Sequence, residues 1–488
     1  MDPQTIGLVE SDIAESVKCY IQDKRNRVNG KFRLVSYQVR RLSEEPVGYL
    51  GDHYLLDVNL REKMVHYSPE EEEKYAEEEY ISFFVKVIPD NVPKLADYIK
   101  EMGCFRKEIL LYKHVIPRLQ DVMIGTRPFV STAYFTKGDR MIVFENLTSE
   151  GYSIVEHTKH LLDFEHLKVA LQAVAKLHAS SLILEERSKT PIPKLFVGYL
   201  NENAYVDDDD HVRKINLENA IQVLCEMIKR IEKYASSEKL DEILLKVPDV
   251  IRKIYDFSKP STVFRNVLNH GDLWCNNVMF RYEMIPTSVD SSCINTEGHL
   301  PEGRKVTSDR EDQAETGKDA DVSNSALFVS NANHESRRRI PVEAKLVDFQ
   351  LARFAPPVLD VWTLIMLCST RAFRQLHLTA LLDSYYQTLG NLLLSNSNMN
   401  IEPIISRNEY SASCDCFALA GLIESLLFSH LTLLPKQAAK DMLNCSENFD
   451  NFLRGNGKLH ICLRYFQQDT NYRNRMTEML EELVESLK

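Results

Sequence analysis

The chain has 488 residues, of which 44% are hydrophobic and 27% are charged, and its formal net charge is −12. This composition is typical of a soluble globular protein and excludes a largely disordered chain. The acidic balance argues against a nucleic-acid partner, because such partners are bound by basic surfaces that neutralise phosphates. The length predicts two or three structural units.

The N-terminal segment, residues 1–18, lacks the basic lead and the apolar core of a signal peptide, so we expect a cytoplasmic protein. The most apolar stretches, residues 361–368 and 417–434, are too short or carry Glu424 and His430, so no membrane partner is expected. The ten cysteines form neither a disulfide framework nor a zinc pattern, which favours reduced thiols. Nothing in the sequence indicates an oligomeric state.

The first third of the chain is predicted to be rich in strands. Residues 31–67 alternate β-branched and aromatic residues with polar ones, interrupted by Gly48 and Gly51, which predicts paired strands joined by a turn. Residues 80–88 are apolar on both faces of a predicted strand, and residues 140–147 form another.

Helical periodicity dominates the remainder. A helical stretch is predicted from residue 93 to about residue 115, and the segments 216–256 and 358–488 show similar patterns. Asp163 is placed to cap a further helix, and His178 lies on its buried stripe, where we expect a hydrogen-bonded structural histidine. That stripe consists of Leu167, Leu171, Val174 and Leu177. Strands followed by helices predict a two-lobed α+β arrangement.

Two short motifs carry the strongest functional signal. The first is HGDLWCNNVMF, residues 270–280, and the second is KLVDFQ, residues 345–350. Phosphoryl transfer needs hard oxygen ligands for Mg²⁺ and a base that orients the attacking hydroxyl, and Asp272, Asn277 and Asp348 are of the right types. Either aspartate alone is equally well explained as a turn residue. Their joint occurrence at kinase spacing disfavours that explanation.

Together these motifs resemble the aminoglycoside phosphotransferase and choline kinase superfamily, and more closely the insect ecdysteroid kinase-like family, also called CHK kinase-like. The resemblance implies a protein kinase-like α+β fold with a small strand-rich N-lobe, a large helical C-lobe and a nucleotide cleft between them. We expect an N-terminal helical extension over residues 1–30, a nucleotide-binding N-lobe over 31–147, a C-lobe over 148–488 and a disordered insertion over 285–339.

The same resemblance implies roles for individual residues and implies ATP and Mg²⁺ as cofactors. Asp272 would be the catalytic base, and Asn277 and Asp348 would be the Mg²⁺ ligands. His270 would support the loop, and Asp360 would brace it from the start of a helix.

Lys86 supplies a signal that does not depend on the family. It interrupts an apolar strand, where an unpaired charge is costly. Glu108 shares a helical face with Phe105, Ile109 and Tyr112, so it is predicted to point inward and to pair with Lys86. Kinases hold the lysine that contacts the ATP phosphates in this way. The alternative is that Lys86 extends to a strand edge while Glu108 is solvated.

Two further segments are candidate nucleotide contacts. Gly48 and Gly51 lie where a phosphate-covering loop is expected, although a simple hairpin turn explains them almost as well. Glu145, Asn146 and Leu147 resemble the hinge whose backbone binds adenine, and we expect their side chains to matter little.

The acceptor is predicted to be a small molecule with a hydroxyl group. Only twelve positions separate Asp348 from Asp360, which leaves no room for the segment with which protein kinases dock a peptide. By resemblance the acceptor is an ecdysteroid or another apolar alcohol, and choline-like or xenobiotic alcohols are rivals. The competing class is a non-catalytic small-molecule or nucleotide-binding protein, although the motif lysine, base and metal ligands are all retained. Asn269 departs from the apolar residue that is more common in the family.

Two polar segments are predicted to lie outside regular structure. The acidic run 70–79 should be a solvated hairpin loop, because clustered like charges repel. Residues 285–339 are polar without apolar periodicity and are expected to form a dispensable loop at a hairpin tip. The alternative is a lid over the cleft, with the arginines 337–339 contacting phosphates.

Overall fold

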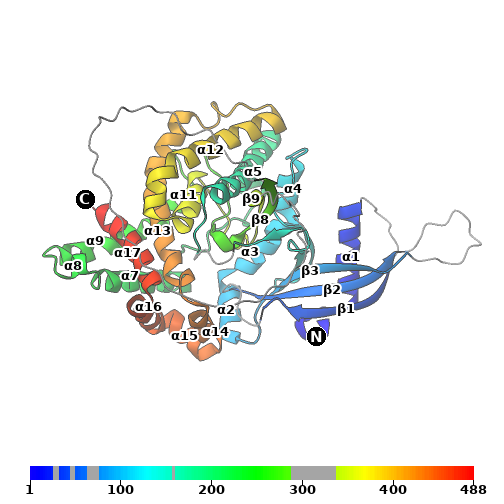
Figure 1. The fold of residues 1–488 in the computed structure, drawn as a ribbon, viewed down its shortest axis with the longest axis horizontal. Coiled ribbons are helices and arrows are strands. Elements are labelled where there is room, and N and C mark those ends of the chain that lie inside the picture. Colours follow the sequence, from blue (N-terminus) through cyan, green and yellow to red (C-terminus); the bar gives the residue numbers. More distant parts are fainter. Residues whose placement is uncertain (26–31, 44–49, 63–75, 156–159, 287–336, 488) are drawn as a thin grey trace, which may run out of the picture. The chain divides into compact units, whose positions relative to one another are not determined.

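The computed structural model describes most of the chain and divides it into two compact units. The described residues are 1–25, 32–43, 50–62, 76–155, 160–286 and 337–487. One unit comprises residues 1–282 and 341–488, and the other comprises Glu283–Ile340. The first unit combines a small antiparallel sheet with a large helical part, which is a two-lobed, kinase-like α+β fold (Figure 1).

A five-stranded antiparallel sheet forms the core of the small lobe, with the strand order β1-β2-β3-β5-β4. Its strands are β1 (Phe32–Arg41), β2 (Asp52–Glu62), β3 (Glu79–Val87), β4 (Ala133–Lys137) and β5 (Met141–Glu145). The strands predicted over residues 31–67, 80–88 and 140–147 are therefore confirmed. Most of the acidic run and Gly48 lie outside the described residues, and Glu79 opens β3.

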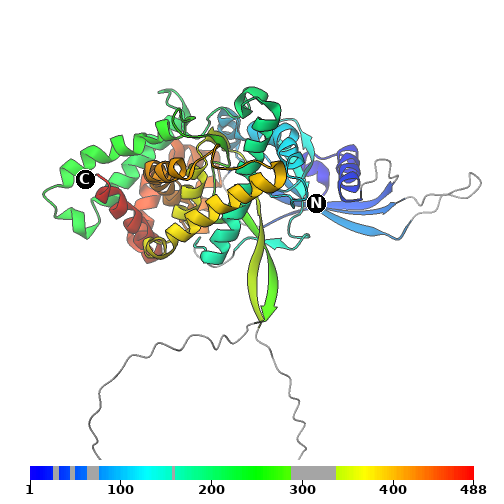
Figure 2. The same ribbon diagram turned by 90° about the horizontal axis from the view of Figure 1, so that it is seen from above.

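The N-terminal helix α1 (Glu10–Arg25), which follows the short helix η1 (Pro3–Ile6), packs against this sheet. Ile13, Val17 and Ile21 recur every four residues and share a buried apolar cluster with Phe83 and Val85 of β3. Both ribbon views show α1 beside the strands (Figures 1 and 2). The segment expected as an extension thus contributes directly to the core of the small lobe.

The helical stretch predicted from residue 93 consists of several pieces. These are α2 (Pro93–Met102), α3 (Cys104–Leu110), the π-helical turn η2 (Leu111–Val115) and α4 (Ile116–Asp121). Gly103 ends α2 with a φ of 64°, a left-handed conformation that glycine adopts without a side-chain clash. The stretch therefore continues beyond residue 115 but is interrupted at Gly103.

The large lobe is built from helices. They are α5 (Phe164–Ser188), α6 (Ile192–Leu195), α7 (Val212–Ile228), α8 (Glu232–Ala235), α9 (Leu240–Arg252), α10 (Ile254–Phe257), η3 (Cys275–Asn277), α11 (Val358–Cys368), α12 (Arg371–Ser397), α13 (Arg407–Thr432), α14 (Lys436–Leu443), α15 (Ser446–Arg454), α16 (Gly457–Gln468) and α17 (Thr470–Glu485). The predicted cap of α5 is present, because the Asp163 side chain accepts a hydrogen bond from the amide of His166. Helix α11 is buried throughout and packs against α13.

Two small sheets carry the sequence motifs. Strand β7 (Val267–Asn269) pairs with β10 (Arg353–Ala355), and β8 (Val278–Pro286) lies between β6 (Tyr152–Ser153) and β9 (Arg337–Leu346). Strands β7 and β8 flank the first motif, and β9 leads into the second. Both motifs therefore start or end on strands, as expected. Residues 287–336 of the predicted insertion lie outside the described residues.

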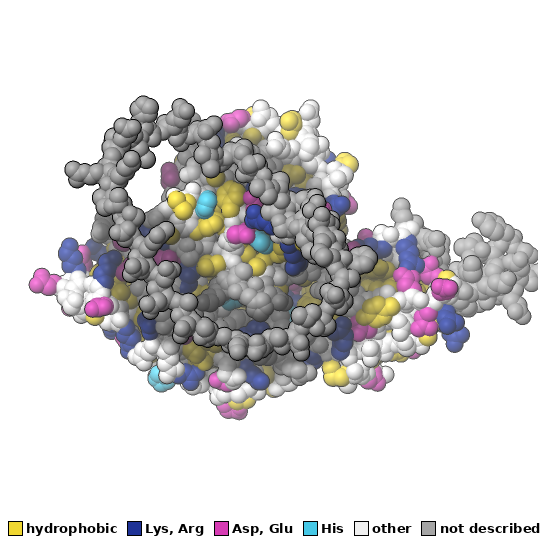
Figure 3. All heavy atoms as spheres, viewed as in Figure 1, with side chains coloured by type: hydrophobic (Ala, Val, Ile, Leu, Met, Phe, Trp, Pro, Cys, Tyr) yellow, Lys and Arg dark blue, Asp and Glu magenta, His cyan; other side chains and the backbone are white. Residues whose placement is uncertain are grey.

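The most apolar helices of the described residues are largely buried inside the fold. In the described part of the chain two helices, α5 and α13, are long and apolar enough to cross a bilayer, but their apolar windows are 83% and 56% buried in the fold. Burial of this kind is typical of the core helices of soluble proteins. Charged side chains of both signs are interspersed on the face drawn in Figure 3.

Candidate active site

The first motif turns sharply after β7, and Gly271 makes that turn. Its φ is 78°, and a Cβ atom at this position would come within 2.1 Å of the Leu351 carbonyl oxygen. Only glycine therefore fits, because any side chain would collide with the backbone directly after the second motif. The close approach of the two backbones explains how segments that are distant in the sequence share one site.

Asp360, in the first turn of α11, binds the backbone of this loop. Its carboxylate accepts hydrogen bonds from the amides of His270 at 2.6 Å and Gly271 at 3.0 Å. The ring of His178 lies 3.2 Å from the same carboxylate and 2.6 Å from the hydroxyl of Tyr385. Burial tends to raise the pKa of Asp360, but these partners hold it below its usual range. His178 is thus the hydrogen-bonded structural histidine that the sequence predicts.

His270 connects the two motifs directly. Its Nε2 lies 2.9 Å from the carbonyl oxygen of Val347, and its Nδ1 accepts a hydrogen bond from the amide of Asp272 at 3.3 Å. Burial lowers the pKa of His270, which favours a neutral ring. A neutral ring with its proton on Nε2 satisfies both contacts, so His270 fixes the position of Asp272 relative to the strand before Asp348.

Asn269, the departure from the family pattern, has a structural explanation. Its side-chain amide donates to the carbonyl of Ala355 at 2.7 Å, and its Oδ1 accepts from the amide of Asp360 at 3.3 Å. The buried polar side chain therefore joins β7 to β10 and to the start of α11.

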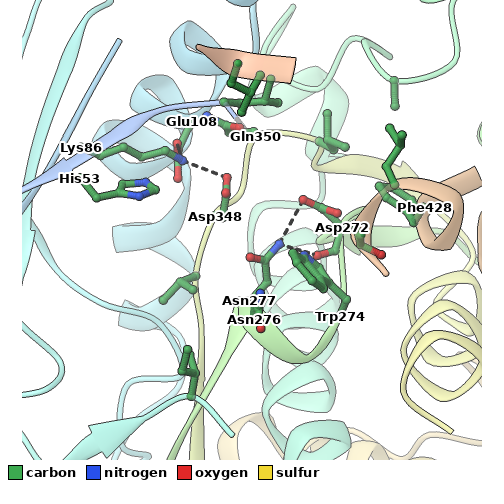
Figure 4. Close-up of a pocket in the computed structure, with 18 of the residues that line it drawn as sticks. His53, Lys86, Glu108, Asp272, Trp274, Asn276, Asn277, Asp348, Gln350 and Phe428 are labelled. Carbon is green, nitrogen blue, oxygen red and sulfur yellow. Dashed lines mark hydrogen bonds and ion pairs between the residues drawn. The ribbon is translucent and has the colours of Figure 1, made fainter. Parts of the chain in front are cut away.

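Three polar side chains line the cavity beside this loop, those of Asp272, Asn277 and Asp348 (Figure 4). Asn277 Nδ2 donates to the backbone oxygen of Asp272 at 2.8 Å and to its Oδ2 at 3.0 Å. Asp348 has a φ of 68°, which is uncommon for a residue other than glycine. Burial, and after it the charge of Asp348, raises the pKa of Asp272 to about 8.

Lys86 joins this cluster from the small lobe. Its Nζ lies 2.8 Å from Glu108 Oε2 and 3.0 Å from Asp348 Oδ1. Burial lowers the pKa of Lys86, but the attraction of Asp348 and Glu108 outweighs it and raises the pKa above its ordinary value. Burial raises the pKa of Glu108, and the contact with Lys86 opposes that shift. The ion pair expected between Lys86 and Glu108 is therefore present.

The two candidate nucleotide segments border the same cavity. Gly51 lies against Lys86, since a Cβ atom there would be 3.4 Å from the lysine Cε. Glu145, Asn146 and Leu147 line the cavity, and the Glu145 side chain also has structural contacts that the sequence did not indicate. Its buried carboxylate bridges Lys24 of α1 at 2.6 Å and Lys345 of β9 at 2.9 Å.

A single cavity of about 710 Å³ connects these residues to an apolar region of the large lobe. We call that region the apolar chamber. Its walls come from α7, α13, α14 and α15 and consist of Arg213, Asn216, Leu217, Ala220, Leu427, Phe428, His430, Leu431, Thr432, Lys436, Met442, Leu443, Phe449, Phe452 and Leu453. In the view of Figure 4, Asp272 is drawn between Asp348 and Phe428.

The residues of the cluster fit a Mg²⁺ ion held jointly with phosphates. In the described part of the chain no group of three or more His, Cys, Asp or Glu side chains is arranged as a complete metal site. Mg²⁺ in phosphoryl-transfer sites is commonly held by one or two protein oxygens together with phosphate oxygens and water, so a complete protein cage is not required. The carboxylate of Asp348 and the amide oxygen of Asn277 supply ligands of this type.

Sequence reasoning missed several residues that shape the site. Arg353 pairs with Glu424 at 2.8 Å, both are almost fully buried, and Arg353 also donates to the carbonyl of Gly271. A charge within an apolar run, the signal that identified Lys86, marks both of these residues and also Lys345. Trp274 and His430 line the cavity without any comparable sequence signal.

The comparison with known families agrees with this geometry. The model of the ecdysteroid kinase-like family matches residues 52–291 and 327–397, which is more than half of the chain. No curated protein matches the chain. The matched range includes β3 with Lys86, both motifs and α11 with Asp360. The chain belongs to the ecdysteroid kinase-like family.

Proposed function

We propose that the protein is a cytoplasmic, ATP- and Mg²⁺-dependent kinase that transfers the γ-phosphate to a hydroxyl group of an apolar small molecule. Membership of the family implies kinase-like phosphotransfer to a small molecule. The observation that carries the finer proposal is the continuity of one cavity from Lys86, Asp348 and Asp272 into the apolar chamber. A phosphate donor and an apolar acceptor would meet at Asp272.

In this proposal the small lobe, residues 31–147, binds the nucleotide. Lys86, positioned by Glu108, contacts the phosphates, and Gly51, which lies against Lys86, belongs to the loop that covers them. The backbone of Glu145, Asn146 and Leu147 binds adenine, while the Glu145 side chain ties this segment to α1 and β9.

The large lobe, residues 148–488, supplies the remaining groups. Asn277 and Asp348 hold Mg²⁺, which when bound neutralises charge on the phosphates. Asp272 accepts the proton of the acceptor hydroxyl and orients its oxygen toward the phosphate. His270 and Asp360 act only by positioning that loop, through the hydrogen bonds to its backbone.

The chemistry of the apolar chamber favours a neutral acceptor. Among the described residues that form its walls there is no Asp or Glu, whereas Arg213 and Lys436 are present. A cation such as choline would meet positive charge without a wall carboxylate to balance it. An ecdysteroid or another apolar alcohol, xenobiotic alcohols included, suits these walls better. The non-catalytic alternative is disfavoured because Lys86, Asp272, Asn277 and Asp348 are all retained.

The test is an ATP-consumption screen of the purified protein with Mg²⁺ against three sets of alcohols: ecdysteroids, other neutral apolar alcohols, and cationic alcohols such as choline. We expect turnover with neutral apolar alcohols that is abolished by EDTA. Turnover with choline alone would contradict the proposed acceptor class. Tight acceptor binding without any ATP consumption would favour the non-catalytic alternative.

A further inference from the structure

Lys107, the residue before Glu108 in α3, is a buried lysine that the proposed mechanism does not use. It is 6% exposed, and its Nζ donates to Oδ1 of Asn203 at 2.6 Å and to the carbonyl of Ala352 at 2.9 Å. Burial lowers the pKa of Lys107 to about 7. Both of its partners are uncharged acceptors, so the contacts do not depend on an ion pair. They fix the end of this side chain in the large lobe.

Helix α3 is too short to hold its own position. It has seven residues, starts after Gly103 without a side-chain cap, and continues into the π-helical turn η2. Isolated helices of this length are marginal in water, so tertiary contacts decide where α3 lies. Consecutive residues of a helix point about 100° apart, so Lys107 and Glu108 hold α3 from two different sides. Glu108 contacts Lys86 of β3, whereas Lys107 contacts the large lobe.

Asn203, between α6 and α7, uses both polar groups of its buried side chain to connect separate parts of the fold. Its Oδ1 accepts from Lys107, and its Nδ2 donates to the carbonyls of Met102 at 3.3 Å and Gln350 at 3.1 Å. Met102 ends α2, where helix carbonyls lack partners within the helix. Gln350 follows Asp348 by two positions. One carboxamide thus joins the junction of α2 and α3 to the second motif.

The backbone around Asn203 is itself fixed by charged side chains. Arg213 Nε donates to the carbonyls of Asn203 at 3.1 Å and Ala204 at 3.0 Å. Glu202 accepts a hydrogen bond from the amide of Ala204 at 2.6 Å, and its other carboxylate oxygen lies 3.4 Å from Nε of Arg353. Asn203 is therefore a fixed anchor for α3.

The connection bears directly on Lys86. Glu108, one residue after Lys107, lies 2.8 Å from Lys86 Nζ, and Asp348, four residues before Ala352, lies 3.0 Å from the same atom. A shift of α3 relative to the second motif would separate Lys86 from one of these carboxylates. Such a separation is unfavourable, because it leaves a buried charge with fewer partners.

We propose that Lys107 and Asn203 are positioning residues for nucleotide binding, which join α3 to the second motif so that Lys86 is already held between Glu108 and Asp348 when the nucleotide arrives. This inference rests on the proposed function, since the site that they organise is the proposed phosphate site. Neither Lys107 nor Asn203 is among the described residues that line the cavity. Both therefore act through other residues, without touching a ligand.

The first test measures affinity by calorimetry for the Mg²⁺ complex of adenylyl imidodiphosphate, an ATP analogue that cannot transfer its γ-phosphate. Lys107→Met and Asn203→Leu keep the approximate size of each side chain without its hydrogen-bonding groups, and each should weaken binding about tenfold or more. Lys107→Arg still has donors for both oxygens and should bind within about threefold of the wild type. Arg106→Met alters the preceding residue of α3, which is 70% exposed, and should change the affinity less than about twofold.

A double variant distinguishes positioning from a general loss of stability. If Lys107→Met acts by displacing Glu108 from Lys86, it should weaken binding by no more than about threefold when Glu108→Gln is already present. Two independent effects would multiply instead, and that result would overturn the positioning role of Lys107.

Hydrogen exchange followed by mass spectrometry gives a second readout, which needs no nucleotide. Wild-type α3 should have the same protection, within about twofold, with and without the nucleotide analogue, because its contacts are already formed. Lys107→Met and Asn203→Leu should each raise the exchange rate of residues 104–110 about tenfold or more, while α5 keeps its protection. Protection of wild-type α3 that rises when the analogue is added would overturn the inference. Variants in which α3 and α5 lose protection together would do the same.

The two readouts separate this inference from the proposed function. A wild-type protein that binds no nucleotide would contradict the proposed function, and the exchange rates of the variants would then decide whether Lys107 and Asn203 hold α3 in place. Nucleotide binding that is equally tight in the wild type and in both variants would support the proposed function and overturn the inference. If Lys107→Met does not fold, Asn203→Leu and the exchange of the wild-type protein decide in the same way.

Discussion

The Nζ atom of Lys86 lies 2.8 Å from Oε2 of Glu108, although the two residues are 22 positions apart in the chain. Both side chains are almost fully buried, at 4% and 1% exposure. Each charge would be strongly unfavourable in the core without the other. The pair therefore fixes α3 against β3 and holds the lysine at the edge of the cavity.

The first prediction is that Lys86 and Glu108 act as a unit. Lys86→Met and Glu108→Gln should each lower kcat/KM strongly, because each leaves the other group without its partner. The double variant should lose less than the sum of the two single effects, with a coupling of about 0.5–3 kcal/mol. Steady-state kinetics of the four proteins give the coupling directly. Strict additivity would show that the pair has no functional role as a pair.

The second prediction concerns Asp272. Asp272→Asn keeps the shape of the side chain but removes the base, so kcat should fall by about 10² to 10⁴-fold. Nucleotide affinity, measured by calorimetry, should change little. Asp249→Asn is the matched control, since Asp249 is 82% exposed and its ion pair with Arg252 lies at the surface. Full activity of Asp272→Asn would refute the assignment of the base.

The third prediction concerns Mg²⁺. Asp348→Ala should weaken ATP binding by about tenfold or more in saturating Mg²⁺, because the ion links protein oxygens to the phosphates. In EDTA the affinities of variant and wild type should converge. Asp348→Asn is a useful companion, since asparagine tolerates the positive φ at this position. An affinity that is unchanged in Mg²⁺ would argue against Asp348 as a ligand.

Much of this site was predictable because its charged residues stand out in apolar surroundings. Lys86 and Glu108 interrupt strand and helix patterns, and helical spacing shows which way Glu108 points. Arg353 and Glu424 interrupt apolar runs in the same way, but 71 positions separate them and no periodicity relates them. Their pairing depends on how α13 packs beside β10, and a single sequence does not encode that packing locally.

Other features depend on tertiary contacts alone. The packing of α1 on the sheet places Lys24 beside Glu145, and no local sequence pattern indicates this ion pair. Nδ1 of His430 contacts the carbonyl of Leu426, and its Nε2 has no partner among the described residues, which the sequence does not indicate. Sequence patterns predict helices, strands and their buried faces, whereas these contacts form only when the buried faces pack against one another.

The fourth prediction tests the buried Lys458, whose Nζ donates to the side chain and backbone oxygens of Asn216. Burial lowers the pKa of Lys458 from 10.5 to about 7. Between these values the unfolded chain binds the proton that the folded protein lacks, so the contribution of this residue to the free energy of unfolding rises with pH. Below pH 7 Lys458 is protonated in the folded and the unfolded protein, so burial of its charge lowers the free energy of unfolding by the full amount.

Lys458→Met should therefore increase the free energy of unfolding near pH 7, and the gain should shrink as the pH approaches 10. Urea denaturation of both proteins at several pH values measures this difference. The exposed Lys259→Met serves as the control, with little effect at any pH. A gain that stays constant between pH 7 and 10 would show that Lys458 keeps its proton in the folded state.

The last prediction is that the segment between β8 and β9 is dispensable for catalysis. The contacts that set the spacing of Asn277 and Asp348 lie at the base of these strands. The amide of Val347 donates to the Asn277 carbonyl at 3.0 Å, and Arg281 pairs with Glu343 at 3.0 Å. All of these residues belong to the larger unit of the chain.

Replacing residues 286–338 with a four-residue turn that contains Asn-Gly should therefore leave kcat within a few-fold. Closure entropy grows as (3/2)RT ln n, so shortening the loop from about 53 to about 4 residues should stabilise the protein by at most roughly 2.3 kcal/mol. Thermal unfolding and ATP titration test both points. The competing explanation is a lid over the phosphates, which the arginines 337–339 would contact. One outcome is a shortened protein that unfolds at the normal temperature or above and still binds ATP at least tenfold more weakly. That result would establish the lid, because the contacts between β8 and β9 near Asn277 and Asp348 would then be intact.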